Sequence, residues 1–237
     1  MGGFSLASIL ERRHGGLPMS GTSSFAPHDL LASRLLPHVD GAGDGSHDLA
    51  HLQRVWKNAF AINAEEGHPC DPEVLAAAVL LHDCVVVEKS SPLRSQASRL
   101  AAEKASGVLT SLGWDAARTE AACHAVAAHS FSAAIPPRTP EARVLQDADR
   151  LDAIGMIGAA RCFYTAGRMG SSLYDPADPR AEARPLDDRN FALDHFEVKL
   201  LKLASGFQTT GGARMAEIRQ DRLRRFRDEF LEEVALP

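Results

Sequence analysis

Residues 72–83 read PEVLAAAVLLHD, and this stretch decides the fold. Pro72 suits the first turn of a helix, where its missing N–H costs no hydrogen bond. The positions that follow are apolar on almost every side of a helix, and such a helix is normally buried. The stretch ends in two polar residues, His82 and Asp83. It therefore predicts a buried helix with an imidazole and a carboxylate at its carboxyl end.

The preceding stretch, 47–64, predicts a helix with a polar edge beside its apolar stripe. Four polar side chains fall within an arc of about 60° at 100° per residue. They are His47, His51, Arg54 and Asn58. Because strand-type alternation is absent over any useful length, we expect an all-α fold. Further helices are predicted at 29–36, 97–112, 115–129, 139–163, 189–204 and 212–234, with 1–24 as a flexible N-terminal extension and 167–187 as a long surface loop.

The composition excludes several classes of protein. The 237 residues carry a formal net charge of −5, without the basic excess of a general nucleic-acid binder. The longest apolar runs fall far short of the ~20 residues that span a bilayer. The four cysteines form no CxxC pair and no zinc-ribbon spacing, which indicates reduced thiols. We therefore expect a cytoplasmic protein that binds neither nucleic acid nor membrane, and whether it forms a homodimer stays open.

A third polar segment, QDADRLD at 146–152, lies inside a predicted helix. Asp149 and Asp152 share one face at i, i+3 spacing. The same pattern also fits an exposed acidic stripe with a neighbouring arginine as its ion-pair partner. Gly155 and Gly158 follow, and each weakens a helix by about 1 kcal/mol relative to alanine. These glycines indicate close packing against another backbone.

The three segments together supply two imidazoles and two carboxylates from separate helices. Taken singly, each also fits a plainer structure, namely a solvated polar face, a helix end or an acidic stripe. The mixed donor set suits Mn, Fe, Co, Ni or Zn and, with added water, Mg. Such an ion keeps positions for water and a substrate oxygen, acidifies the water and neutralises a phosphate. We expect one divalent ion, with Mn favoured.

The sequence resembles the HD-domain phosphohydrolase superfamily, whose pattern is a His, an adjacent His-Asp on the next helix and a later Asp. The similarity runs through about residues 46–203, in HDLAHLQRVW, LLHDCVVVEKSSPLRSQASRLAAE, AHSFSAAIPPRTPEARVLQDADRLDAIG and LDHFEVKLLKL. It is closer to the bacterial YedJ-like branch, which includes metal-dependent nucleotide pyrophosphohydrolases. The resemblance implies a compact helical bundle, with 25–237 as a single domain and a metal-site core at about 46–160. It also implies four metal ligands: His51, His82, Asp83 and Asp149.

A nucleotide substrate brings several negative charges, so this acidic protein needs local cations. We expect substrate contacts from Arg54, Lys89, Arg94, His129 and Lys199. A general acid or base is expected among Asp152, Glu88 and Asp48. Glu88-Lys89 stands where the YedJ-like branch tends to have Pro-Lys. The expected reaction converts nucleoside triphosphates to monophosphate and pyrophosphate. The alternatives are a phosphomonoesterase or phosphodiesterase acting on another nucleotide, and a non-catalytic nucleotide- or metal-binding module.

Overall fold

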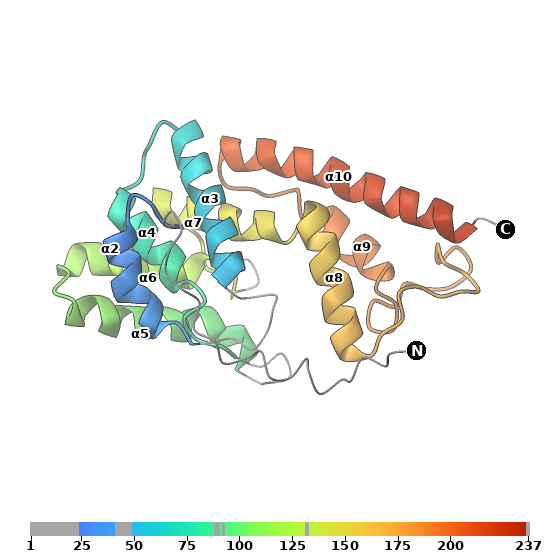
Figure 1. Cartoon of the computed structure of the whole chain (residues 1–237), viewed down its shortest axis with the longest axis horizontal. Coiled ribbons are helices and arrows are strands. Elements are labelled where there is room, and N and C mark those ends of the chain that lie inside the picture. Colours follow the sequence, from blue (N-terminus) through green and yellow to red (C-terminus); the bar gives the residue numbers. More distant parts are fainter. Residues whose placement is uncertain (1–23, 41–48, 88–90, 92, 131–132, 236–237) are drawn as a thin grey trace, which may run out of the picture.

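The computed structural model describes residues 24–40, 49–87, 91, 93–130 and 133–235 of the chain. Within these ranges the regular elements are helices, and the β-type pairing is one isolated bridge between Ser172 and Phe191. The expected all-α class is therefore confirmed (Figure 1). The α-helices are α2 (Asp29–Leu35), α3 (Leu49–Glu65), α4 (Pro72–Leu81), α5 (Ala97–Ser111), α6 (Ala116–Ala128), α7 (Pro140–Asp152), α8 (Gly155–Met169), α9 (Asp194–Val198) and α10 (Thr210–Ala235), and the 3₁₀ segments are η2 (Leu36–His38), η3 (Arg94–Gln96) and η5 (Leu200–Lys202).

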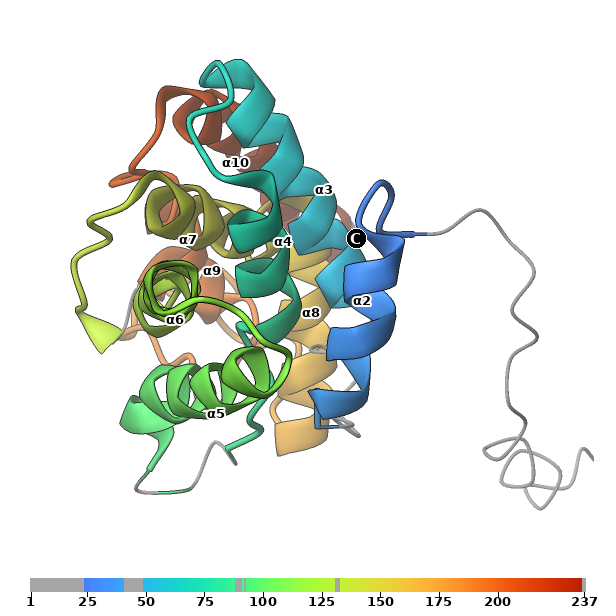
Figure 2. The same cartoon turned by 90° about the vertical axis from the view of Figure 1, so that its left-hand side faces the viewer.

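Helix α4 is the buried helix that residues 72–83 predict. The Asp71 carboxylate caps it by accepting hydrogen bonds from the N–H groups of Glu73 and Val74 at 2.9 and 3.1 Å. Every side chain from 74 to 81 is buried. Helices α2, α3, α6 and α7 pack around α4 (Figure 2). Apolar burial is the dominant favourable term in folding, so it fixes α4 among its neighbours. His82 and Asp83, which directly follow α4, are thereby held in place.

The single helix predicted at 139–163 is wrong, because the structure divides it into α7 and α8. Ile154 between them has an extended backbone, with φ −125° and ψ 171°. Gly155 then adopts φ +72°, a conformation that L side chains rarely enter. The chain therefore changes direction at 153–155, and α8 packs against α10 instead of continuing α7. The two glycines mark this turn and not the interior of one long helix.

The helix predicted at 189–204 is much shorter in the structure. Its first residues bond to the preceding loop, since the N–H groups of Ala192 and Leu193 donate to the carbonyls of Ser172 and Leu173 at 2.9 Å. Only α9 and the 3₁₀ segment η5 remain helical. The preceding loop is the predicted surface loop, although α8 extends to Met169 before it begins.

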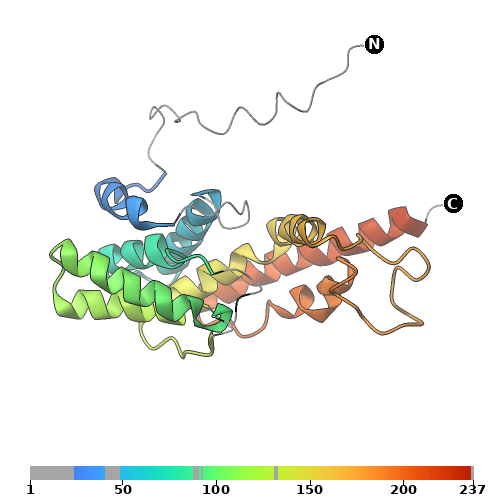
Figure 3. The ribbon, with the colours of Figure 1, turned by 90° about the horizontal axis from the view of Figure 1, so that it is seen from below.

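Helix α10 joins two apolar clusters. The main core gathers side chains of α2 to α7 and includes Ala216 of α10. The second cluster lies under α8, α9 and the later part of α10. Helix α10 contacts both α7 and α8, and Figure 1 shows α8 meeting α10 at a steep angle. Figure 3 shows the length of α10 from below. The residues of the second cluster are Ala159, Leu193, Phe196, Leu200, Leu223 and Leu231. None of the described helices combines the length and apolarity needed to cross a membrane.

Asp147 of α7 anchors the start of α10. Its buried carboxylate accepts hydrogen bonds from the backbone N–H groups of Gln208 and Thr209 and from the Thr209 hydroxyl, at 2.7–3.1 Å. Burial raises the pKa of Asp147, although these hydrogen bonds act in the opposite direction. A Cβ at Gly212 would lie 2.6 Å from Asp147 Oδ2, so only glycine permits this approach. These hydrogen bonds tie the start of α10 to α7, the helix that also carries Asp149.

The N-terminal extension predicted at 1–24 lies outside the described residues, except for its last position. The helix predicted at 47–64 corresponds to α3, which is described from Leu49 to Glu65. Residues 47 and 48 lie outside the described residues.

We expect Gly158→Ala to destabilise the fold by roughly 1–3 kcal/mol, the usual cost of overpacking. A Cβ at position 158 would lie 2.3 Å from the backbone carbonyl oxygen of Ala153, where the chain turns between α7 and α8. Chemical denaturation of the two purified proteins measures the loss. Gly167→Ala is the matched control, because nothing lies within 4 Å of its added Cβ on the same helix. If both substitutions change stability equally, the tight turn at 153–158 is not as described.

Candidate metal centre

Three helices bring four polar side chains to one place. His51 comes from α3, His82 and Asp83 from the carboxyl end of α4, and Asp149 from α7. His51 Nε2 lies 3.2 Å from His82 Nε2, and these nitrogens lie 3.8 and 3.5 Å from Asp83 Oδ2. Asp149 Oδ1 lies 3.6 Å from His51 Nε2 and 4.0 Å from His82 Nε2. Adjacent donors bound about 2.1 Å from one ion lie about 3.0–3.4 Å apart, so a small contraction would complete a cation site.

The other ring nitrogens determine which atoms face this centre. His82 Nδ1 donates to the Val79 carbonyl at 2.8 Å. His51 Nδ1 faces the Asp152 carboxylate at 2.8 Å, and a carboxylate accepts hydrogen bonds. If both rings are neutral, both Nε2 atoms therefore present lone pairs to each other at 3.2 Å. That contact is repulsive unless a proton or a cation lies between them. The donor set thus fits a divalent cation.

His82 is well suited to act as a neutral ligand. Its side chain is fully buried, and burial lowers its pKa to about 4 even though Asp83 and Asp149 oppose the shift. An imidazole that stays neutral near pH 7 keeps its Nε2 lone pair available, which is the form that binds metals. Burial of the ring and the Val79 hydrogen bond therefore fix both its charge and its orientation.

Asp152 contacts Nδ1 of His51, the ring nitrogen that does not face the other proposed ligands. Its fully buried carboxylate accepts hydrogen bonds from Arg54 Nε and Nη2 at 2.6 and 3.0 Å and from Arg161 Nη1 at 3.0 Å, and it faces His51 Nδ1. Burial alone would raise its pKa, but His51, Arg54 and Arg161 outweigh that effect and hold the pKa far below the usual range. The burial of this carboxylate and the donors around it favour a positioning role, which the proposal below takes up. The acid–base role predicted for Asp152 from the sequence stays a prediction.

His129 lies at the other side of Asp83. It follows α6, its Nδ1 donates to the Val126 carbonyl at 2.6 Å, and its Nε2 lies 3.6 Å from Asp83 Oδ1. Burial alone would lower the pKa of His129, but Asp83 and Asp149 outweigh burial and raise it. The ring also packs against His82, with centroids 5.0 Å apart. The structure thus brings His129 to the centre, although the sequence separates it from every other member.

A cavity of about 440 Å³ lies between α8, the loop after it and the α9–η5 segment, and none of the four proposed metal ligands lines it. Its lining holds apolar groups, several basic side chains and the carboxylate residue Asp188. Lys199, expected to contact substrate, lies in this lining. Arg161 also lines the cavity, and its Nη1 contacts Asp152, the carboxylate that faces His51. Arg161 and Asp152 therefore link the cavity to the metal centre. The size of the cavity falls within the ~300–1,000 Å³ typical of small-molecule sites.

Sequence reasoning missed Arg161, Arg189 and His195 of this cavity. Arg161 belongs to no motif, and it lies nine positions after Asp152, across the turn between α7 and α8. No spacing rule for a continuous helix would pair those two residues.

The remaining predicted site residues are only partly accounted for. Arg54 is held by Asp152 and does not line the 440 Å³ cavity. Arg94 begins η3, but its side chain lies outside the described part of the structure. Asp48, Glu88 and Lys89 also lie outside the described residues.

These features define a class: an all-α protein whose converging helices carry a histidine and aspartate centre fit for a divalent cation. Residues 48–154 match the HD domain family. The Bacillus subtilis protein YpgQ is 30% identical over 184 residues, which cover 76% of this chain and 80% of YpgQ. The chain therefore belongs to the HD domain family and is an HD-superfamily hydrolase.

Solved structures agree with this assignment. An HD-superfamily hydrolase from Bacillus thuringiensis is 28% identical with a TM-score of 0.67, covering 89% of this chain and 98% of that one. The crystal structure of YpgQ in complex with ADP is also 28% identical, with a TM-score of 0.66, covering 86% and 98%. The narrower resemblance to the YedJ-like branch stays a prediction.

Proposed function

We propose that this chain hydrolyses nucleoside triphosphates to a monophosphate and pyrophosphate in a reaction that depends on one divalent metal ion. His51, His82, Asp83 and Asp149 would hold the ion, with Mn favoured. The observation that carries the proposal is the 3.2 Å approach of two imidazole nitrogens beside two carboxylates. The ADP bound to YpgQ supports a nucleotide ligand.

Each side chain has a task in this proposal. A bound divalent ion would activate a water molecule and offset the charge of the phosphate oxygens. Asp152 keeps the His51 ring oriented, as carboxylates commonly do behind metal-binding histidines. Arg161 and Lys199 supply cations along the 440 Å³ cavity, which takes the rest of the nucleotide. His129 contacts the substrate beside Asp83. Glu88 and Asp48 remain the predicted acid–base candidates.

The test is a nucleotide panel with Mn, Co, Ni and Mg, followed by product identification by chromatography. We expect cation-dependent release of pyrophosphate and the matching monophosphate. Release of orthophosphate would instead identify a phosphomonoesterase, and an opened cyclic nucleotide would identify a phosphodiesterase. Tight nucleotide binding without turnover under every metal would leave a binding module.

Lys199→Ala is expected to lower kcat/KM for the nucleotide about ten-fold, mainly through a higher KM. Lys199 lines the 440 Å³ cavity, and a charge-assisted contact to phosphate is worth roughly one such factor. Steady-state kinetics on the best substrate of the panel measure the change. Lys202→Ala is the matched control, because Lys202 is exposed on the neighbouring η5 segment and does not line the cavity. Equal kinetics for both variants would place the nucleotide elsewhere.

A further inference from the structure

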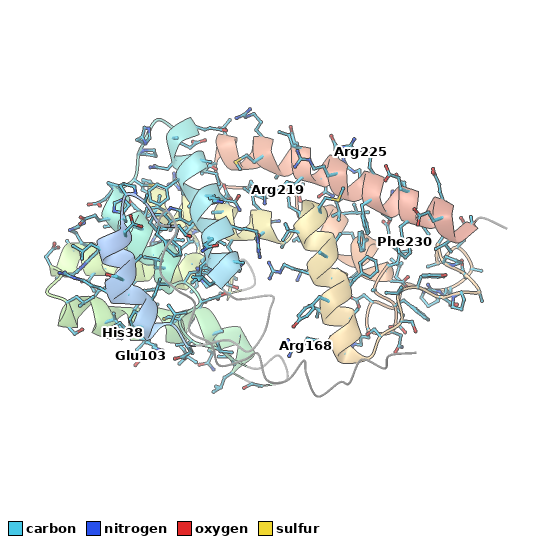
Figure 4. The ribbon with its side chains drawn as sticks, in the orientation of Figure 1. His38, Glu103, Arg168, Arg219, Arg225 and Phe230 are labelled. Atoms are coloured by element: carbon cyan, nitrogen blue, oxygen red, sulfur yellow. The ribbon has the colours of Figure 1, made fainter. Side chains whose placement is uncertain are left out.

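A second cavity, of about 340 Å³, lies between α3, α10 and the turn from α7 to α8. Its charged lining residues are Arg54 and Lys57 of α3 and Arg219 and Arg222 of α10. None of the four proposed metal ligands lines it, nor does any residue of the 440 Å³ cavity. Figure 4 shows Arg219 where α10 faces α3. The two cavities are therefore separate, because they share no lining residue.

Positive charge dominates this cavity. All nine of its lining residues belong to the described part of the chain, and none of them is acidic. Arg219 donates to two neutral oxygens, the Leu151 carbonyl and Asn58 Oδ1, at 2.6 and 2.7 Å. These contacts hold the guanidinium in place without cancelling its charge. Arg54 does contact a carboxylate, Asp152, but that group also serves Arg161 and His51.

The cations are close enough to affect one another. Burial lowers the pKa of Arg219, and the nearby charges of Arg222 and Arg54 lower it further, against the opposing effect of Asp152. Lys57 and Arg222 are exposed, and neither pairs with an acidic group among the residues that the structure describes. A protein with a net charge of −5 thus concentrates four cations around one hollow. A bound anion would relieve their mutual repulsion.

The lining suits phosphate better than a simple anion. Guanidinium groups bind phosphate oxygens in pairs through parallel N–H donors, and three of the four cations are arginines. The first turn of α8 (Gly155, Met156 and Ile157) also lines the cavity, and its N-cap residue Ile154 supplies no side-chain acceptor. The partial positive charge of a helix N-terminus adds to the field of the arginines.

We propose that this cavity binds a polyphosphate group, held by Arg54, Lys57, Arg219 and Arg222. The group belongs either to free inorganic pyrophosphate or to the triphosphate tail of a nucleotide. The site lies outside the metal centre and does not depend on the reaction proposed above. Its nearest link to that centre is Arg54, which contacts the cavity on one side and Asp152 on the other.

Isothermal titration calorimetry on the full chain tests this site. Inorganic pyrophosphate, a nucleoside triphosphate and sulfate are titrated separately, with and without a chelator. The variant Lys57→Gln/Arg222→Gln should weaken binding at least about ten-fold, because each lost contact to a charged group is worth roughly that factor. Both side chains are exposed, so the fold should survive, and thermal unfolding checks this.

The matched control is Arg34→Gln/Arg225→Gln, which removes the same charge from exposed positions on α2 and α10 that do not line the cavity. Figure 4 labels Arg225 on α10. Weakened binding of pyrophosphate assigns the site to the free anion, and weakened binding of the nucleotide alone assigns it to the triphosphate tail of a nucleotide. Equal losses in both double variants, unchanged affinity in the cavity variant, or sulfate binding as tightly as pyrophosphate would overturn the proposal. Because binding is measured directly, a failure of the proposed hydrolysis would not affect the result.

Discussion

Asp83→Ala is expected to lower cation-dependent nucleotide hydrolysis by about 10³-fold or more. The Asp83 carboxylate places Oδ2 3.5 Å from His82 Nε2 and 3.8 Å from His51 Nε2, while Oδ1 lies 3.6 Å from His129 Nε2. Removing it takes away one proposed ligand and the partner of His129 together. A bound ion contributes several kcal/mol to stabilising charge in a transition state, which corresponds to a factor of that size.

The same variant should keep its fold, because the Asp83 side chain is 33% exposed and follows the buried part of α4. Turnover and metal content, measured on purified protein, provide the readouts. His82→Ala should lose activity as well, but His82 is fully buried, so its loss also opens a cavity in the core. Glu73→Ala, at the opposite end of α4, is the control and should leave both readouts unchanged. Unchanged turnover in Asp83→Ala would remove the proposed metal centre.

Asp152→Asn is expected to weaken metal binding by about 10–100-fold, the usual effect of losing the group that orients a ligand. It should also cost about 3 kcal/mol of folding stability. Two arginines and one imidazole converge on this carboxylate, and removing one partner of a buried pair leaves the other charges uncompensated. Competition with a coloured chelator measures metal affinity, and denaturant unfolding without metal measures stability.

Asp147→Asn separates these two effects. Asp147 is equally buried on the same helix, but its carboxylate anchors the backbone at Gln208 and Thr209 and does not contact a metal-site histidine. This variant should lose stability and keep its metal affinity. If the two variants lower metal affinity to the same extent, Asp152 acts only through the fold, and its positioning role is refuted.

Much of this protein could be predicted from local sequence. The α4 helix follows from an apolar run with proline at its start, and its burial leaves His82 and Asp83 at its carboxyl end. Periodicity places His51 and Asp149 on predicted helices, and the resemblance to the HD-domain superfamily implies that they meet His82 and Asp83, as they do in the structure. Helical periodicity determines the face of each residue, because it depends only on neighbours within a few positions.

The turn between α7 and α8 could not be predicted in this way. The two glycines indicate a close backbone approach, but the pattern around them predicts one continuous helix. What decides the direction is the positive φ of Gly155 and the fit of α8 against α10. This packing depends on side chains more than 50 residues further along the chain, such as Arg219, whose Cβ lies 3.2 Å from the Cβ position of Gly155.

The sequence by itself determined an all-α chain, its buried central helix and the donor types of a metal centre, since these depend on residue type and short-range spacing. Only the tertiary structure decided the burial and the partners of Asp152, the presence of Arg161 beside it and the two cavities. Asp152 meets His51 across 101 positions, and such a contact is set by how whole helices pack, not by any local pattern. The local sequence is equally compatible with an exposed and a buried Asp152, and only the packing of the helices decides between them.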